Sequence, residues 1–470
     1  MPGYANWKQL YKEEYFQLEQ EGYDVKGGCR PESAGEAILP FPDTAEEVLT
    51  EAEERRWKDW YGKLWKIREK GIRPDYPYSE PETEKEILQT IAQTPHMQPL
   101  LEEEYTDRIM GAVSGRCAGV VLGKPLEMGF DRKTIQKYLE SVGQYPLDDF
   151  VEGYSPKLDM RLREDCVPST RGNVRYVQQD DDIHYTVLAL KLAEECGEAF
   201  TGEDIGRLWT ENLPYRWFWC ASRQAYYHYV NLESTERRWE RIKEFPTKQN
   251  PWRECIDGQI RCDMWGYLNP GNPGKAALSA FRDCSFSLTK NGIYSGMFTA
   301  GCISAALTAD TDVHKILEAG LRVIPEKSRL AEAVRLVMGW YDGDFVKTCD
   351  KIYETYGNLP FAAAVNNMAM VTLSLLYGNL DYTKTITTAV MCGLDTDCNA
   401  GTAGSIAGAA IGAGKIPRRW TEPLNNTLKT AVASFGEGTI AGVAERIIRL
   451  YKKKSADIGT GKREVSKNAL

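Results

Sequence analysis

Two clusters of aspartates are the residues of this chain best suited to chemistry. Asp180, Asp181 and Asp182 stand side by side, and Asp395 and Asp397 follow more than two hundred positions later. Adjacent carboxylates repel one another, so placing them together is costly unless a cation compensates. Magnesium takes oxygen ligands, and carboxylates are its usual donors in proteins. If the fold brings the two clusters together, they form a cage for one or two metal ions.

Helix capping is the plainer explanation for either cluster taken alone. Each cluster stands where a helical segment begins, and aspartate is favoured at the cap and in the first turn of a helix. A cap needs only one aspartate, however, and each cluster has more than one. We therefore predict that the metal ligands are Asp180, Asp181, Asp182, Asp395 and Asp397.

The composition is that of a globular protein. The 470 residues are 42% hydrophobic and 27% charged, and the net charge is −9. An acidic chain lacks the surplus of Lys and Arg that binds phosphates, which argues against nucleic acid as the main partner. No apolar run reaches the length of about 18 residues that predicts a membrane span, and the N-terminus lacks a signal-peptide core. We therefore expect a cytoplasmic protein with no membrane partner.

The cysteines and histidines do not form a zinc pattern. Twelve cysteines are scattered without a CxxC pair, and the four histidines are unclustered. Without a secretion signal, such cysteines are expected to be reduced and mostly buried. His184 follows the first acidic cluster, but a hydrogen-bonded helix histidine is preferred to a metal ligand there.

The segments that must position the aspartates have the spacing of helices, with no alternation of strands and helices. Gly111, Gly115, Gly119 and Gly123 recur at intervals of four and predict a bare stripe for the close approach of another helix. The short length and Arg116 argue against a membrane helix here. We predict helices over 108–123, 185–197, 295–309, 331–343, 361–378 and 439–454. The fold class is therefore all-α.

The composition changes along the chain and indicates three parts. Residues 1–100 are rich in Trp, Tyr, Glu and Lys, residues 101–455 are rich in Ala, Gly, Leu and Val, and residues 456–470 are charged. We predict a helical N-terminal extension, an all-helical catalytic domain and a flexible tail. Aromatic side chains on charged helices suit docking. We expect the extension to cover part of the main domain and to offer a contact for a homo-oligomer.

Three blocks of the sequence, in order, resemble the signature of the ADP-ribosylglycohydrolases, which include hydrolases that remove ADP-ribose from arginine, serine and dinitrogenase reductase. The blocks are DRIMGAVSGRCAGVVLGKPLEMG, QDDDIHYTVLAL and GLDTDCNAGTAGSIAGAAIGAGKIPRRW, and the resemblance covers roughly residues 105–450. The family's first block ends in a glutamate, matched here by Glu127. The resemblance implies a compact orthogonal bundle of helices. It also implies a binuclear Mg²⁺ centre, sometimes Mn²⁺, that hydrolyses a ribosyl linkage.

The chain departs from the family pattern at several positions. Val120 stands where the first block usually has an aspartate, Asp180 where the acidic block has a threonine, and Cys398 where the last block has a threonine. Thiolate is a soft ligand that suits magnesium poorly, so we do not assign Cys398 to the metal. Lys290 replaces a histidine of the family's Ser-Leu-Thr-His stretch. We expect the metal chemistry to be kept and the leaving group or sugar substituent to differ.

The resemblance also implies roles for residues around the metals. Glu127 is expected to act as general base or as a gate, beside the catalytic Asp182 and Asp397. The stretch around Lys290 suits a loop whose backbone N–H groups approach the substrate, with the lysine binding an anionic group. A plain turn, core packing and a solvated lysine are the alternatives. The predicted substrate-binding residues are Glu127, Asp263, Trp265, Lys290, Asn291, Gly292 and Tyr294.

Three functions are considered, in order of preference. The first is a magnesium-dependent glycohydrolase that cleaves the C1″ bond of a ribosylated substrate, an ADP-ribosyl conjugate by default, with weak action on ADP-ribosyl-arginine and ADP-ribosyl-serine. The second is a relative that keeps the metal cage and binds ADP-ribose without turnover. The third is a metal phosphatase, which lacks support because no phosphate-cradling glycine loop and no Lys/Arg cluster stand beside the acidic blocks.

Overall fold

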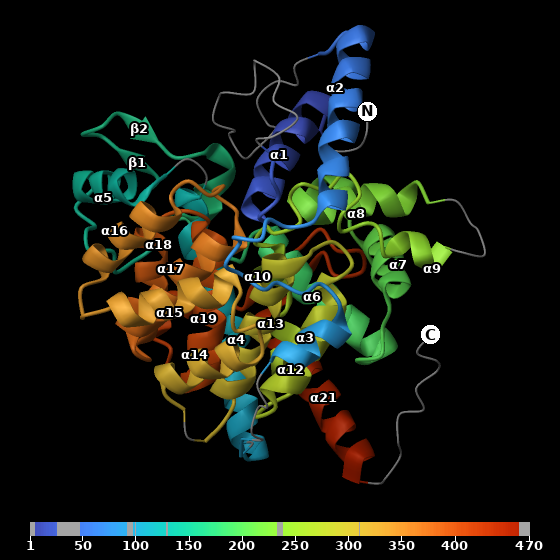
Figure 1. Cartoon of the computed structure of the whole chain (residues 1–470). Helices are drawn as coiled ribbons and strands as arrows, with labels where there is room; N and C mark the ends of the chain where they lie inside the picture. Colours follow the sequence, from blue (N-terminus) through green and yellow to red (C-terminus); the bar gives the residue numbers. More distant parts are fainter. Residues whose placement is uncertain are drawn as a thin grey trace.

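The chain folds almost entirely into helices (Figure 1). This computed structural model describes residues 5–25, 48–91, 97–98, 100–127, 130–232, 238–309 and 311–459. Within these ranges the strands form two small antiparallel hairpins, β1 (Tyr154–Ser155) with β2 (Met160–Arg161) and β3 (Thr427–Lys429) with β4 (Glu437–Thr439). The all-α prediction is confirmed.

Helices built from small and apolar residues form the centre of the main domain. Nearly every side chain of the helices α13, α17 and α19 is buried, as expected for helices that are apolar on all sides. The central helices are α4 (Glu102–Gly123), α6 (Asp181–Cys196), α10 (Asp257–Arg261), α13 (Lys290–Ala306), α17 (Ala364–Gly378), α18 (Tyr382–Met391) and α19 (Thr396–Ile411).

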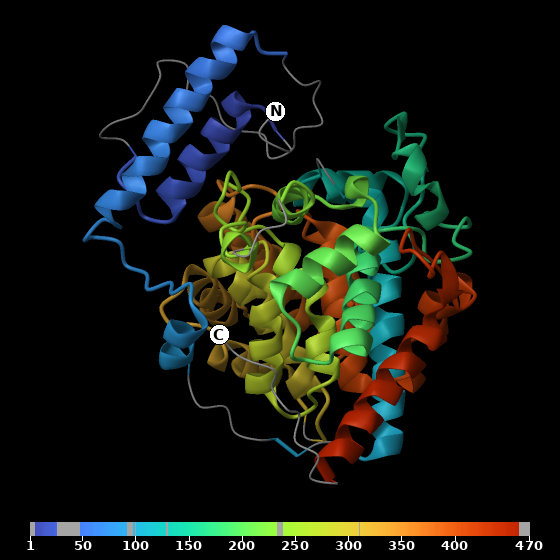
Figure 2. The same cartoon turned by 90° about the vertical axis from the view of Figure 1, so that its right-hand side faces the viewer.

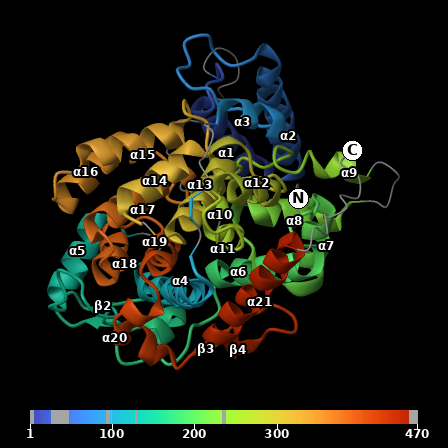
Figure 3. The same cartoon turned by 90° about the horizontal axis from the view of Figure 1, so that it is seen from below.

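Amphipathic helices surround this centre (Figure 3). These outer helices are α5 (Arg132–Ser141), α7 (Gly202–Asn212), α8 (Cys220–Val230), α9 (Arg238–Ile242), α12 (Pro273–Cys284), α14 (Val313–Arg322), α15 (Arg329–Trp340), α16 (Phe345–Tyr356), α20 (Arg418–Thr421) and α21 (Ile440–Gly459). The short α11 (Asp263–Tyr267) is fully buried and belongs to the centre. Each of the six predicted helical segments therefore falls on a helix. No helix within the described ranges combines the length and the apolar character needed to cross a bilayer.

The last helix, α21, runs beside α4 (Figure 2). It continues to Gly459, four residues into the segment predicted as a flexible tail. The rest of that predicted tail, residues 460–470, lies outside the described residues.

The predicted glycine stripe is the contact between α4 and α19, which pack antiparallel. A Cβ atom added at Gly111, Gly115, Gly119 or Gly123 would come within 2.5 Å of a backbone carbonyl oxygen of α19. The residues that carry these oxygens are, in the same order, Gly408, Gly404, Ala400 and Thr396. Only glycine fits such a contact, because the two backbones lie directly against each other. As a result, the end of α4 meets the beginning of α19.

The described residues of the N-terminal extension form an arm that stands on the main domain (Figure 2). We call residues 5–25 and 48–91 the N-terminal arm. It contains α1 (Trp7–Gln20), α2 (Glu51–Trp65) and the short α3 (Glu84–Thr90). The helices α1 and α2 share a small core of their own, in which the Tyr11 and Trp57 rings lie 5.4 Å apart.

Buried ion pairs attach the arm to the main domain. The guanidinium of Arg253 binds Glu14 at 2.8 Å and Glu21 at 2.6 Å, and all three side chains are fully buried. Arg329 binds Glu80 at 2.7 Å in the same region. The arm therefore covers part of the main domain, as the aromatic density suggested. Residues 1–4 and 26–47, also part of the predicted extension, lie outside the described residues.

Candidate metal centre

Three segments of the chain meet at a cavity of about 380 Å³ in the main domain. They are the short 3-10 helix η2 (Lys124–Leu126) at the end of α4, the start of α6, and the start of α19. Asp180 and Asp181 line the cavity from one side, and Asp395 and Glu127 line it from the others. The glycine contact brings this about, since it holds the end of α4 against the start of α19.

Two cations and one thiol donate hydrogen bonds to the aspartates of the first acidic cluster. Asp180 caps α6: its Oδ1 accepts a hydrogen bond from the backbone N–H of Asp182 at 3.0 Å. The ammonium of Lys124 donates to its Oδ2. Asp182 is fully buried behind it, where Arg116 donates to Oδ1 and the Cys398 thiol donates to Oδ2, both at 3.0 Å. Every carboxylate oxygen of Asp180 and Asp182 therefore has a protein partner.

The second acidic cluster has a carboxylate oxygen with no partner. Carboxylate oxygens of Glu127, Asp395 and Asp397 lie within 4.8 Å of one another. Asp395 is 5% exposed, and its Oδ1 has no hydrogen-bond partner. A buried oxygen of this kind is costly to leave unpaired. Oxygen donors so placed fit a hard divalent cation such as Mg²⁺ or Mn²⁺.

The pKa values of these carboxyls are raised. Burial is the main cause for Asp181, Asp182, Asp395 and Asp397, and repulsion from neighbouring carboxylates adds to it. Burial and the charge of Asp397 raise the pKa of Glu127 to about 8. A bound cation reverses this effect, because it favours the charged form of each carboxyl.

Arg116 holds the carboxylates of Asp182 and Asp263 together beside the centre. It interrupts the glycine stripe of α4, and its buried guanidinium contacts Asp182 at 3.0 Å and Asp263 at 3.2 Å. Asp263, predicted to bind substrate, therefore lies on the far side of Arg116 from Asp182 and is absent from the cavity wall. The sequence signal for this role was an arginine among small residues of an otherwise apolar helix.

Two more of the predicted substrate-binding residues are structural. Trp265 is fully buried, its indole N–H donates to Asp283 at 2.8 Å, and its ring stacks on Phe200. The ammonium of Lys290 binds Glu21 of the N-terminal arm at 2.8 Å. Neither residue lines the cavity. The expected contact of Lys290 with an anionic substrate group is therefore unsupported, because that charge is already paired.

The predicted ligand-binding loop after Lys290 is instead the first turns of α13, and the loop prediction is wrong. Asn291 donates hydrogen bonds to Glu80 and Glu254, both at 2.8 Å, and Tyr294 donates to a backbone carbonyl of the arm. A Cβ at Gly292 would clash with the backbone of Arg253. These residues serve helix packing and arm docking, and none of them lines the cavity.

Three other residues of the cavity wall were not marked by any pattern in the sequence. Trp217 and Trp219 line it from the 3-10 helix η4 (Tyr215–Trp217) and the residue before α8. Arg163 lines it as well, and its guanidinium lies 3.4 Å from Glu127. Aromatic rings and a guanidinium suit the recognition of a base, a sugar face or an anionic group. The run YRWFWC was the only available signal.

His184 behaves as a packed helix histidine. Its Nε2 accepts a hydrogen bond from the backbone N–H of Ala431 at 3.0 Å, and its ring meets the ring of Trp217 edge to face. Burial lowers its pKa to about 4. One ring nitrogen is thus occupied by the backbone, whereas Nδ1 is buried without a hydrogen-bond partner. His184 belongs to none of the metal-binding groups of the described residues, which favours the helix-histidine interpretation.

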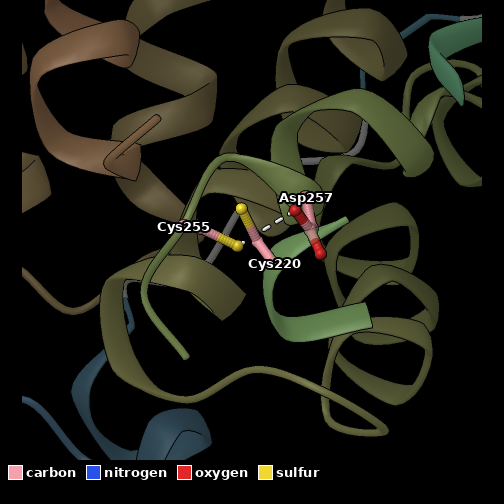
Figure 4. A group of neighbouring side chains, drawn as sticks. All are labelled: Cys220, Cys255 and Asp257. Carbon is pink, nitrogen blue, oxygen red and sulfur yellow. Dashed lines mark hydrogen bonds between the residues drawn. The ribbon is translucent and has the colours of Figure 1, made fainter. Parts of the chain in front are cut away.

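Two thiols and a carboxylate lie close together beside the cavity (Figure 4), and two of these residues, Cys220 and Asp257, line its wall. Ligand atoms of Cys220, Cys255 and Asp257 lie within 4.8 Å of one another, and the Cys255 thiol donates to Asp257 at 3.0 Å. The Ser222 hydroxyl donates to the other oxygen of Asp257 at 2.6 Å. Burial raises the pKa of the Cys255 thiol. The cysteines of the described residues are all free and mostly buried, as predicted.

The chain is similar to one family model and to a solved structure. One solved structure, titled "ADP-ribosylglycohydrolase-related protein complex", is 18% identical, with a TM-score of 0.45, and the match covers 74% of this chain and 99% of that chain. No curated protein matches the sequence. The family model described as ADP-ribosylglycohydrolase matches residues 101–457, which include both acidic clusters and Glu127. The chain therefore belongs to the ADP-ribosylglycohydrolase family.

Proposed function

We propose that this protein is a glycohydrolase that depends on Mg²⁺ or Mn²⁺ and cleaves the C1″ glycosidic bond of a ribosylated substrate. The observation that carries the proposal is the group of Glu127, Asp395 and Asp397, whose oxygens lie within 4.8 Å of one another beside a cavity of about 380 Å³. Membership of the family supports the reaction class. An ADP-ribosyl conjugate is the default substrate.

The aspartates would hold the metal. Asp181, Asp395 and Asp397 have carboxylate oxygens available for a cation, whereas Asp180 and Asp182 orient the start of α6 through their protein partners. A bound divalent ion would supply a Lewis acid that binds oxygens of the substrate and lowers the pKa of water.

Glu127 is the group best placed to move a proton. It lies on the cavity wall beside Asp395, where a carboxyl can accept or donate a proton at the scissile bond. Arg163, at 3.4 Å, restrains the carboxyl from the cavity side. Glu127 would therefore serve as the acid or base at the scissile bond, which agrees with the role expected from the sequence.

The cavity wall supports a substrate with an aromatic or sugar face and an anionic group. The rings of Trp217 and Trp219 offer stacking surfaces, and the guanidinium of Arg163, although paired with Glu127 and Asp165, is 37% exposed at the cavity, unlike the buried Lys290. Arg163 is therefore the residue that would bind the anionic group of the substrate, a role first expected of Lys290. Because these contacts come from residues outside the family's signature blocks, we retain the proposal that ADP-ribosyl-arginine and ADP-ribosyl-serine are poor substrates.

The test is release of ADP-ribose, or of another ribosyl product, from a panel of ribosylated proteins and small glycosides. The full chain is assayed after metal removal and again with Mg²⁺ or Mn²⁺. Turnover should require the metal, and Asp397→Ala should abolish both metal binding and turnover. Turnover that persists in the metal-free protein would refute the proposal.

A binding protein without turnover is the competing function, and Glu127→Gln separates the two. This variant removes the transferable proton and keeps the size of the side chain. A glycohydrolase should lose at least 100-fold in rate with little change in ligand affinity, in line with the usual contribution of a general acid or base. An unchanged rate in Glu127→Gln would favour the binding role.

A further inference from the structure

We propose that the centre binds one divalent cation and that the ammonium of Lys124 takes the place of a second one. The inference rests on the proposed function, since it concerns the same centre. It departs from the binuclear centre that the family resemblance implies. Lys124 belongs to η2, which the glycine contact between α4 and α19 holds beside both acidic clusters.

The ammonium of Lys124 lies among carboxylates from three segments of the chain. It is directly paired with Asp180, and both side chains are almost entirely buried. Glu127 lines the same cavity wall as Lys124 and Asp180. A permanent positive charge therefore stands beside the first cluster, where a second metal ion would have to approach Asp180.

In the first cluster only Asp181 still has carboxylate oxygens without a protein partner. Both oxygens of Asp180 and both oxygens of Asp182 already accept hydrogen bonds from the protein. One of the donors is the thiol of Cys398, which brings sulfur to a position where Mg²⁺ would need oxygen. Breaking these contacts would leave Lys124 buried without its paired carboxylate and Arg116 with Asp263 alone, and unpaired buried charges are strongly destabilising.

The second cluster, by contrast, still has a buried carboxylate oxygen without a partner. Asp395 Oδ1 is buried with no partner, and Asp395 lines the cavity next to Glu127. Carboxylate oxygens of Glu127, Asp395 and Asp397 lie within 4.8 Å of one another, so their negative charges repel. One divalent ion there would satisfy the free oxygen and offset the repulsion. The two clusters thus differ in what neutralises them: a lysine for the first and a metal for the second.

The experiment counts manganese ions bound to each chain. The full-length, metal-free protein is titrated with Mn²⁺, and free Mn²⁺ is followed by its electron paramagnetic resonance signal. We expect one ion per wild-type chain, with the spectrum of an isolated ion. Lys124→Met removes the charge and keeps the length of the side chain, so we expect two ions per chain and a spectrum broadened by coupling between them.

Two further variants provide controls. Lys124→Arg keeps the positive charge and should still bind one ion. Lys454→Met removes another lysine that is largely buried and paired with a carboxylate, Glu198, at 2.6 Å, but that lies outside the cavity wall. The number of bound ions should not change in Lys454→Met. A second ion should therefore depend on the charge at position 124 alone.

The outcomes separate this inference from the proposed function. Two coupled ions in the wild-type chain would overturn the inference and leave the metal-dependent hydrolase standing. A folded Lys124→Met variant that still binds one ion would also overturn it. No bound ion in the wild type would overturn the proposed function itself. If Lys124→Met does not fold, the number of ions bound to the wild-type chain still decides whether the centre holds one metal or two.

Discussion

The contact between α4 and α19 leads to a sharp prediction for Gly119→Ala. A Cβ at this position would lie 2.1 Å from the carbonyl oxygen of Ala400, whereas ordinary van der Waals contacts begin at 3.4 Å. The obstacle is backbone on a helix that is buried on all sides. The two helices must therefore separate by about 1 Å, because neither side has a rotamer that could move away.

The energetic cost follows from two opposing effects. Overpacking that shifts the backbone costs about 1–3 kcal/mol, and a clash with a carbonyl oxygen belongs at the upper end of that range. Alanine gains about 1 kcal/mol over glycine in helix propensity. We therefore expect a net loss of about 2 kcal/mol in the free energy of unfolding. A displacement of about 1 Å between Glu127 and Asp397 should also lower the rate by about 100-fold.

Urea unfolding measures the first effect, and the glycohydrolase assay measures the second. The matched control is Gly62→Ala in α2, where an added Cβ meets nothing within 4 Å. That variant should be as stable as the wild type or more stable by up to about 1 kcal/mol, with an unchanged rate. If Gly119→Ala is as stable and as active as the wild type, the glycine contact does not set the geometry of the centre.

Four further predictions concern pH, charge, thiol reactivity and the arm. In the metal-free protein the pKa of Glu127 is raised from 4.5 to about 8, so its contribution to stability is full below pH 4.5 and is lost as the pH rises through 8. Glu127→Gln should therefore flatten the dependence of urea stability on pH in that range, and an unaltered slope would contradict the raised pKa. Arg253→Met leaves the buried Glu14 without its counter-charge and Glu21 with Lys290 alone, which should cost about 3–5 kcal/mol, whereas Arg55→Met, from an exposed pair, should change urea stability by less than about 1 kcal/mol. Burial raises the pKa of the Cys255 thiol, so mass spectrometry should find it unalkylated by iodoacetamide at pH 7.5 until the protein unfolds, and rapid native labelling would argue against this burial. Deletion of residues 1–95 should cause aggregation or loss of an oligomer, which light scattering would detect; a soluble, fully active monomer would speak against a docked arm.

The fold could be predicted because its signals are local. Helical spacing marks each of the main helices, and the glycines of α4 stand at intervals that only a close helix contact explains. The meeting of the two acidic clusters was a weaker inference from the sequence, since it depended on which helix packs against α4. The resemblance to the family supplied that information.

The substrate-binding residues were harder to predict because their surroundings are not local. Lys290 looks like a free charge in the sequence, but its partner Glu21 lies 269 positions away. The same holds for Asn291 and Glu80, which are 211 positions apart. The sequence around Trp217 and Trp219 does not show whether these rings line a cavity or pack in the core. A single sequence shows residue types, whereas burial by a distant segment decides their roles.

The attachment of the arm has a consequence for how the chain folds during synthesis. Glu14 leaves the ribosome 239 residues before Arg253, its counter-charge. Until then, the helix α1 presents two glutamates that are buried only in the finished protein. Contacts between residues so far apart form late, because the intervening chain must first be ordered. The helix α1 is synthesised first but is therefore among the last to dock on the main domain. Until it docks, the nascent chain must stay soluble with the docking surface of α1 exposed.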